Sequence, residues 1–156
     1  VTLVGMFYGA KRLDLIRTII KYSLTRAIGI SISFSIFFLL FSNKILPVFT
    51  DSPEIIRLAV LYFKIMAFAY PFITIGMTSS RIMQGLGIAY PMFILTLFRV
   101  VIISSSLAWY FVIILGKPVH YAWMGSLISC ILTSGFSLIW LRSIIRGSFK
   151  PELINI

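Results

Sequence analysis

The sequence predicts an all-α protein, a polytopic transmembrane helical bundle, and three observations lead to this fold class. Of the 156 residues, 60% are hydrophobic and 12% are charged, about half the charged share of an average soluble domain. The apolar residues form four long runs without the alternation that membrane strands show. The Lys and Arg residues behind the net charge of +10 gather at the ends of these runs, as they do in integral membrane proteins.

The four apolar runs are long enough to be membrane helices, which need about 20 mostly apolar residues. We expect the spans near residues 24–41, 58–80, 91–115 and 119–141. Residues 1–10 are too few to span, and we interpret them as the end of a truncated helix. Residues 142–156 are basic and polar, which predicts a cytoplasmic tail. The whole chain is then a single membrane domain and a fragment of a longer protein.

The connections between the runs carry helix start and stop signals. Pro53 suits a first helical turn, with Asp51 or Ser52 before it as the N-cap. Gly85 and Gly87 fit the end of the second span, and Pro91 fits the start of the third. These signals predict a short loop before the second helix and a tight turn after it.

The Lys and Arg residues near the helix ends predict the orientation in the membrane. Because successive spans cross the membrane in opposite directions, nine of these residues lie on one side of it and three on the other. The larger set belongs in the cytoplasm, so we expect a multi-pass protein of the cell (plasma) membrane with a cytoplasmic C-terminus. The larger set is Lys11, Arg12, Arg17, Lys21, Arg26, Arg81, Arg142, Arg146 and Lys150, and the smaller set is Lys44, Arg57 and Lys117.

The sequence also argues against several classes of function. Cys130 and His120 are the sole residues of their types, so we expect no internal disulfide, no metal site and no catalytic triad. Basic residues that lie mostly at helix ends argue against a nucleic-acid partner. We therefore predict no catalytic residue, no enzyme activity and no cofactor. No Asp or Glu lies inside a predicted span, although ion-coupled carriers normally use an intramembrane carboxylate.

Two basic residues lie within the spans and are candidates for a functional cavity. Arg99 is about eight residues into the third span, roughly 12 Å at 1.5 Å per residue, and Lys64 lies at a similar depth in the second. Because a charge at the bilayer centre is costly, each side chain is expected to line a water-filled cavity or contact moving helices. The alternative is that each one snorkels to the nearer headgroups.

Three further residues of the second span are candidates. Tyr62 and Tyr70 are mid-span aromatic residues that can face flat cations through cation–π contacts, and the alternative is that they face lipid. Pro71 removes one helical hydrogen bond, so it is either a hinge or a static kink.

An ordered series of motifs resembles the multidrug and toxic-compound extrusion (MATE) transporters. The segment VGMFYGAKRLDLIR is similar to a G-x-x-x-G-A helix end of that family and the basic loop after it. The segment ILPVFTDSPEIIRLAVLYFKI is similar to the start of its tenth helix. Its Q-G-x-G turn resembles RIMQGLGIAYPM. Its eleventh helix, where an arginine at the position of Arg99 is common, resembles LTLFRVVIISS, and the start of its twelfth resembles HYAWMGSLIS.

The resemblance implies a fold of two six-helix lobes, of which this chain supplies most of the C-terminal lobe. It implies a secondary active antiporter that exports small amphiphilic or cationic compounds by alternating access. The coupling ion is H⁺ or Na⁺, and its ligands lie in earlier helices outside this chain. The implied partners are membrane lipids and the missing N-terminal lobe. Two alternatives stay open: a flippase for lipid-linked saccharides from the same superfamily, and a membrane scaffold that transports nothing.

Overall fold

The computed structural model describes residues 1–148 as an elongated bundle of helices, and these residues contain no strand. A short helix α1 (Thr2–Gly9) precedes α2 (Leu13–Ile45), which ends in a 3-10 turn, η1 (Leu46–Val48). Helix α3 (Pro53–Gly85) runs back along α2. The chain closes with a segmented helix, detailed below, and with α6 (His120–Ser148). The all-α class is confirmed.

The third long helix is built from alternating α and π segments. It comprises α4 (Tyr90–Leu97), η2 (Phe98–Ser104), α5 (Ser105–Trp109) and η3 (Tyr110–Ile114), where η2 and η3 are π-helical. π-Helix is rare and occurs mostly near functional sites. The sequence analysis did not predict these segments, because their apolar composition is that of an ordinary membrane helix.

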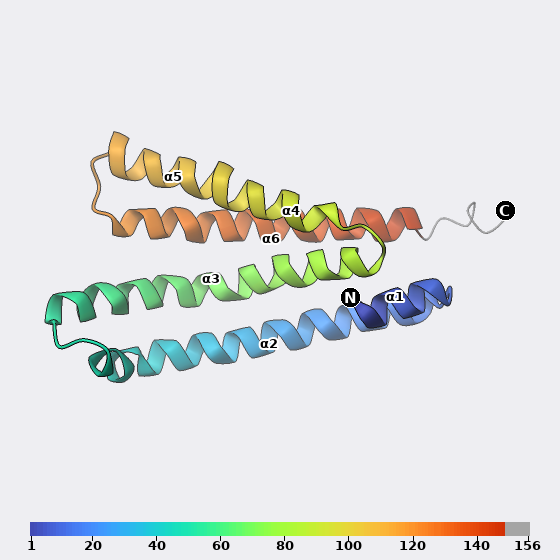
Figure 1. Cartoon of the computed structure of the whole chain (residues 1–156), viewed down its shortest axis with the longest axis horizontal. Coiled ribbons are helices and arrows are strands. Elements are labelled where there is room, and N and C mark those ends of the chain that lie inside the picture. The colour runs from blue at the N-terminus through green and yellow to red at the C-terminus, as the bar shows by residue number, and fades with distance from the viewer. Residues whose placement is uncertain (149–156) are drawn as a thin grey trace.

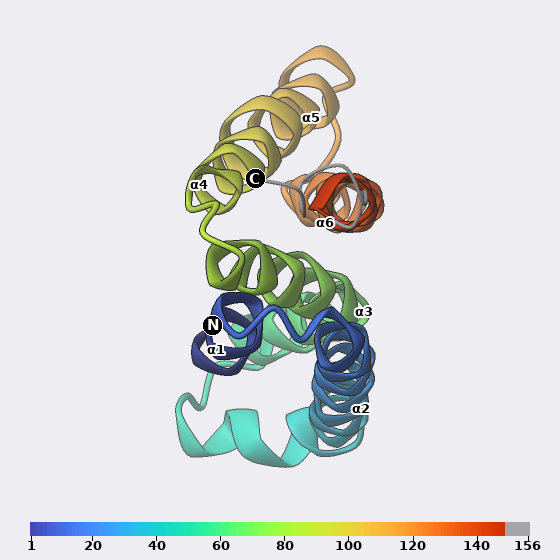
Figure 2. The ribbon, with the colours of Figure 1, turned by 90° about the vertical axis from the view of Figure 1, so that its right-hand side faces the viewer.

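Helix α3 lies at the centre of the arrangement. It contacts α2 on one side and α6 on the other, as the end-on view shows (Figure 2). The segmented helix α4–η3 contacts α6 along η2, α5 and η3, and it reaches α3 through α4. Helix α1 folds back onto α2 and α3 (Figure 1). The layers therefore run from α2 through α3 and α6 to the segmented helix.

The buried apolar core lies at the end of the bundle where the termini of five helices meet. Ile16 and Met83 are fully buried there, and Leu95 and Leu141 are nearly so. Elsewhere small hydroxyl residues fill much of the interior, including Ser79 and Ser137. Small side chains let membrane helices approach closely, so this interior suits a bundle held together by close backbone contact.

Two tight turns of one type reverse the chain at the end that holds the core. After α3, Gly87 N–H donates to Gln84 C=O and Ile88 N–H donates to Met83 C=O, both at 3.0 Å. This is a Schellman turn, and Gly87 has the positive φ of 87° that the turn requires. After α1, Lys11 takes the same left-handed role with a φ of 54°.

The helix start and stop signals predicted from the sequence lie at helix ends in the structure. Helix α3 begins at Pro53 with Ser52 as its N-cap, although the Ser52 side chain makes no capping hydrogen bond. The Gly87 turn ends α3, and Pro91 lies in the first turn of α4. Four helices are long and apolar enough to span a membrane: Asp14–Val48, Pro53–Gly85, Tyr90–Ile114 and His120–Gly147. The chain is a multi-pass membrane protein.

The helices extend beyond the spans expected from hydropathy. Residues 1–10 form a separate short helix, and α6 continues past Leu141 to Ser148. The expected tail is thus helical at its start, while its remainder, 149–156, lies outside the described residues. The depth at which each helix leaves the membrane stays a prediction.

Candidate functional site

Arg99 is the second residue of the π-helical segment η2, and its side chain faces α6. Its Nη1 donates a long hydrogen bond to Cys130 Sγ of α6 at 3.8 Å. Arg99 is half-buried and lines a cavity of about 230 Å³ between α3, α4, η2 and α6. The guanidinium is therefore directed toward α6.

Two serine hydroxyl groups that follow Arg99 in the chain form hydrogen bonds. The hydroxyl groups of Ser104 in η2 and Ser126 in α6 share a hydrogen bond of 2.9 Å. Ser105 Oγ donates to the carbonyl of Val100, five residues back in the same segmented helix, at 2.9 Å. The first of these bonds joins η2 to α6 next to Arg99.

Lys64 lies on a different surface of the bundle. It is exposed and lines an open groove of about 840 Å³ near the connection of α2 and α3. Glu54, Arg57 and His120 line the same groove, but none of them forms an ion pair with Lys64. Lys64 and Arg99 therefore do not form one basic site.

The two tyrosine candidates point to different neighbours. The ring of Tyr62 meets Trp123 of α6 edge-on, with centroids 5.3 Å apart, and its side chain is 38% exposed. Tyr70 lines an apolar cavity of about 510 Å³ between α2 and α3. Ile73 lines both this cavity and the one at Arg99, so the two cavities adjoin at this residue of α3.

Pro71 lies inside α3, and the helix continues through it from Pro53 to Gly85. The proline leaves one carbonyl without its helical donor, but no break in the helix results. Its role as a hinge stays a prediction, as do the cavity roles of Arg99, Lys64, Tyr62 and Tyr70.

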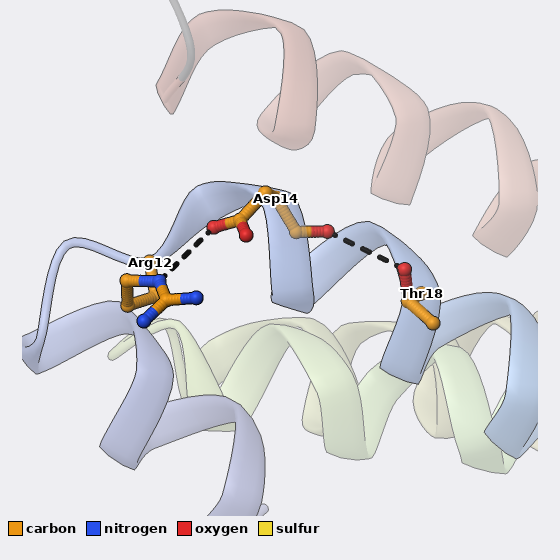
Figure 3. Close-up of polar contacts among 3 residues, drawn as sticks. All are labelled: Arg12, Asp14 and Thr18. Carbon is orange, nitrogen blue, oxygen red and sulfur yellow. Dashed lines mark hydrogen bonds and ion pairs between the residues drawn. The ribbon is translucent and has the colours of Figure 1, made fainter.

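The charged residues outside the helix centres gather at the two ends of the bundle. At the end with the α1–α2 turn, Arg12 Nε lies 3.5 Å from Asp14 Oδ1, and Thr18 Oγ1 donates to the Asp14 carbonyl (Figure 3). Both Arg12 and Asp14 are mostly exposed, so this ion pair adds little stability. Within residues 1–148, no group of three or more His, Cys, Asp or Glu residues is arranged to hold a metal ion.

Two residues that share the cavity with Arg99, Cys130 and Thr133, were not predicted from the sequence. Both lie on α6. Arg99 and Cys130 are 31 positions apart, and hydropathy does not determine how two helices align along their length. Small residues recur every four positions in α6 at Gly125, Ser129, Thr133 and Ser137. This pattern is typical of a packing face, but it does not indicate that the face meets a cation.

A comparison with known protein families identifies the family of this chain. The MatE family model matches residues 1–110. The chain belongs to the MatE family. This is a family of transporters and not of enzymes, so the resemblance seen in the sequence is confirmed. No curated protein matches the chain.

Solved MatE structures share the fold of the chain. One of them is described as the MATE transporter ClbM in complex with Rb⁺, and it is 23% identical with a TM-score of 0.85. The match covers 93% of this chain and 34% of the ClbM chain. Inward-facing and outward-facing conformations of a multidrug resistance MATE family transporter of the MOP superfamily match with TM-scores of 0.86 and 0.84. Each is 23% identical, and they cover 95% and 94% of this chain. The chain spans about a third of the length of these proteins.

Proposed function

We propose that this MatE chain is the C-terminal part of a secondary active antiporter that exports small amphiphilic or cationic compounds. The family membership and the shared fold support a transporter of this type. One observation carries the mechanistic part of the proposal. The chain resembles an inward-facing and an outward-facing conformation almost equally, with TM-scores of 0.86 and 0.84.

That near equality supports alternating access by a rigid unit. If the four long helices repacked between the two states, one state would resemble this chain much better than the other. A unit that keeps its internal packing can instead rock against a second lobe, as many secondary transporters do. The N-terminal lobe is thus the partner that the mechanism requires, and lipids cover the remaining exposed apolar surface.

The aromatic residues of α3 fit a cationic substrate. Tyr62 is 38% exposed beside Trp123, and Tyr70 lines a cavity. Both rings are therefore candidates for a cation–π contact with a flat cation. The coupling ion is H⁺ or Na⁺. Because Asp14, Asp51 and Glu54 lie at the starts of helices or in a loop, we assign the coupling carboxylate to helices outside this chain.

The distribution of charge supports a plasma-membrane orientation with the C-terminus in the cytoplasm. The α1–α2 turn, the α3–α4 turn and the end of α6 lie at one end of the bundle (Figure 1). Their basic residues outnumber those of the opposite end, which are Lys44, Arg57 and Lys117. Lys150 of the larger set lies outside the described residues.

The test is transport by the protein with a complete N-terminal lobe, purified into proteoliposomes. We expect a fluorescent organic cation to move against its gradient when a proton or a sodium gradient is imposed, and not when neither is present. Failure under both gradients would refute drug export. Preferential movement of a lipid-linked pyrophosphate would favour the flippase alternative. A stable oligomer that moves neither would favour the scaffold.

A further inference from the structure

The cavity at Arg99 has polar groups on three helices around one cation. It lies between α3, α4, η2 and α6, has a volume of about 230 Å³, and opens to the surface where Met77 and Thr96 are exposed. Its polar lining consists of Ser80, Thr96, Arg99, Cys130, Thr133 and Ser134. These hydrogen-bonding groups determine which occupant suits the cavity.

Arg99 carries a charge that the described part of the protein does not neutralise. A guanidinium has five N–H donors, and among residues 1–148 the one hydrogen-bond partner of Arg99 is the weak acceptor Cys130 Sγ at 3.8 Å. Within residues 1–148 no carboxylate lies within 4.0 Å of it. A half-buried cation without a counter-ion is costly in a low-dielectric surrounding, so the cavity favours an anion.

Thr133 provides a second and independent observation. Its side chain is 6% exposed, lines the same cavity, and its Oγ1 has no hydrogen-bond partner among the described residues. Buried hydroxyl groups are normally hydrogen-bonded. Thr133 and Arg99 line the same cavity. An anionic group there would accept from the guanidinium and, once the buried Thr133 side chain turns toward it, from the hydroxyl.

The other hydroxyl groups of the cavity already donate within their own helices. Ser80 Oγ donates to the Gly76 carbonyl at 2.8 Å, and Ser134 Oγ donates to the Ile131 carbonyl at 2.8 Å. Thr96 Oγ1 likewise donates to the Met92 carbonyl at 2.8 Å. The donors left for an occupant are therefore those of Arg99 and Thr133, which supply positive charge and a hydroxyl proton.

We propose that this cavity binds a single anionic group, a carboxylate or a halide, held by the Arg99 guanidinium and the Thr133 hydroxyl. The group comes either from a free inorganic anion or from the head of a small amphiphile. The apolar side chains of Phe72, Met77 and Leu95 also line the cavity and suit the short tail of such an amphiphile. The site lies within one lobe, so the inference does not depend on the proposed transport.

Cys130 is the sole cysteine of the chain and reports on the site directly, because its Sγ contacts Arg99. The experiment follows the rate of Cys130 alkylation by N-ethylmaleimide in the full chain, purified in detergent. In one series, sodium chloride replaces sodium gluconate at constant ionic strength. In a second series, hexanoate is added, and hexylammonium is added in its place as the cationic control. We expect chloride or hexanoate to slow alkylation to a saturating limit, while hexylammonium does not. Protection by chloride identifies a free anion, and protection by hexanoate alone identifies an amphiphile head.

Variants then locate the site. Arg99→Gln is expected to weaken the apparent affinity by about tenfold or more, because it removes charge-assisted hydrogen bonds. Thr133→Val keeps the shape of the side chain and is expected to weaken affinity by a smaller factor. The matched control is Arg26→Gln, an exposed arginine of α2 outside the cavity, which should leave the affinity unchanged.

A second measurement keeps the proposal testable if Arg99→Gln fails to fold. The thermal unfolding midpoint of the unaltered chain should rise with the same protecting anion, because a ligand that binds the folded state stabilises it. The proposal is overturned if neither anion protects Cys130 or raises the midpoint, if hexylammonium protects equally well, or if Arg99→Gln retains full affinity. A protein that transports no cation but still shows Arg99-dependent protection would refute the proposed function and leave this site standing.

Discussion

Gly125 lies in close contact with the segmented helix, and replacing it tests how the bundle is held together. A Cβ atom at Gly125 would lie 3.0 Å from Leu107 Cβ and 3.4 Å from the Ala108 backbone nitrogen. Those distances require α5 to shift, and overpacking of this kind costs about 1–3 kcal/mol. Alanine gains about 0.5–1 kcal/mol over glycine in a helix interior. Gly125→Ala should therefore destabilise the chain by up to about 2.5 kcal/mol.

The matched control is Gly135→Ala in the same helix. A Cβ at Gly135 would meet nothing within 4 Å, so the same substitution should be neutral or stabilising. If the unfolded chain keeps its helices in detergent, the helix-propensity gain shrinks equally in both variants, and their difference of about 1–3 kcal/mol persists. The assay is reversible unfolding by sodium dodecyl sulfate in mixed micelles, followed by tryptophan fluorescence. Equal stability of the two variants would refute close backbone contact at Gly125.

Further predictions concern the turns, the π-helical segment and the core, and the same unfolding assay checks them. Gly87→Ala should lower the free energy of unfolding by about 1 kcal/mol, because alanine disfavours the left-handed backbone. Lys11→Gly in the matching turn should raise it by about 0.5–1 kcal/mol. Two changes of the same sign would contradict the turn assignment. A double-mutant cycle of Ser104→Ala and Ser126→Ala should give a coupling of about 0.6 kcal/mol, and zero coupling would mean that the 2.9 Å bond does not form. Ile16→Ala should cost about 2–5 kcal/mol because Ile16 is fully buried, and a cost below that of an exposed Ile30→Ala control would place the core elsewhere.

The helices and their turns could be predicted from the sequence because each depends on local chemistry. Long apolar runs determine membrane helices whatever surrounds them. Pro53 and Pro91 fit the first turn of a helix, and Gly87 fits a left-handed C-terminal turn. Lys11 was not predicted as a turn residue, because a lysine in the left-handed region carries no local signal.

The surroundings of the candidate residues could not be predicted, because they depend on how the helices align. Depth within a span indicated that Arg99 needs a partner, and hydropathy could not identify Cys130 as that partner. The same holds for Tyr62, whose neighbour Trp123 is far away in the sequence and becomes a contact through the packing of α3 on α6. The π-helical segments likewise carry no local signal, and η2 makes a long-range contact through the bond between Ser104 and Ser126.

The most direct test of antiport runs the exchange in reverse. Proteoliposomes with the complete protein are loaded with the organic cation and diluted into medium free of it, with no ion gradient and with a pH-sensitive or sodium-sensitive dye inside. The account predicts that outward flow of the cation drives protons or sodium ions inward, and that the ion movement stops when the cation is omitted. Cation efflux without any movement of protons or sodium would contradict coupled exchange.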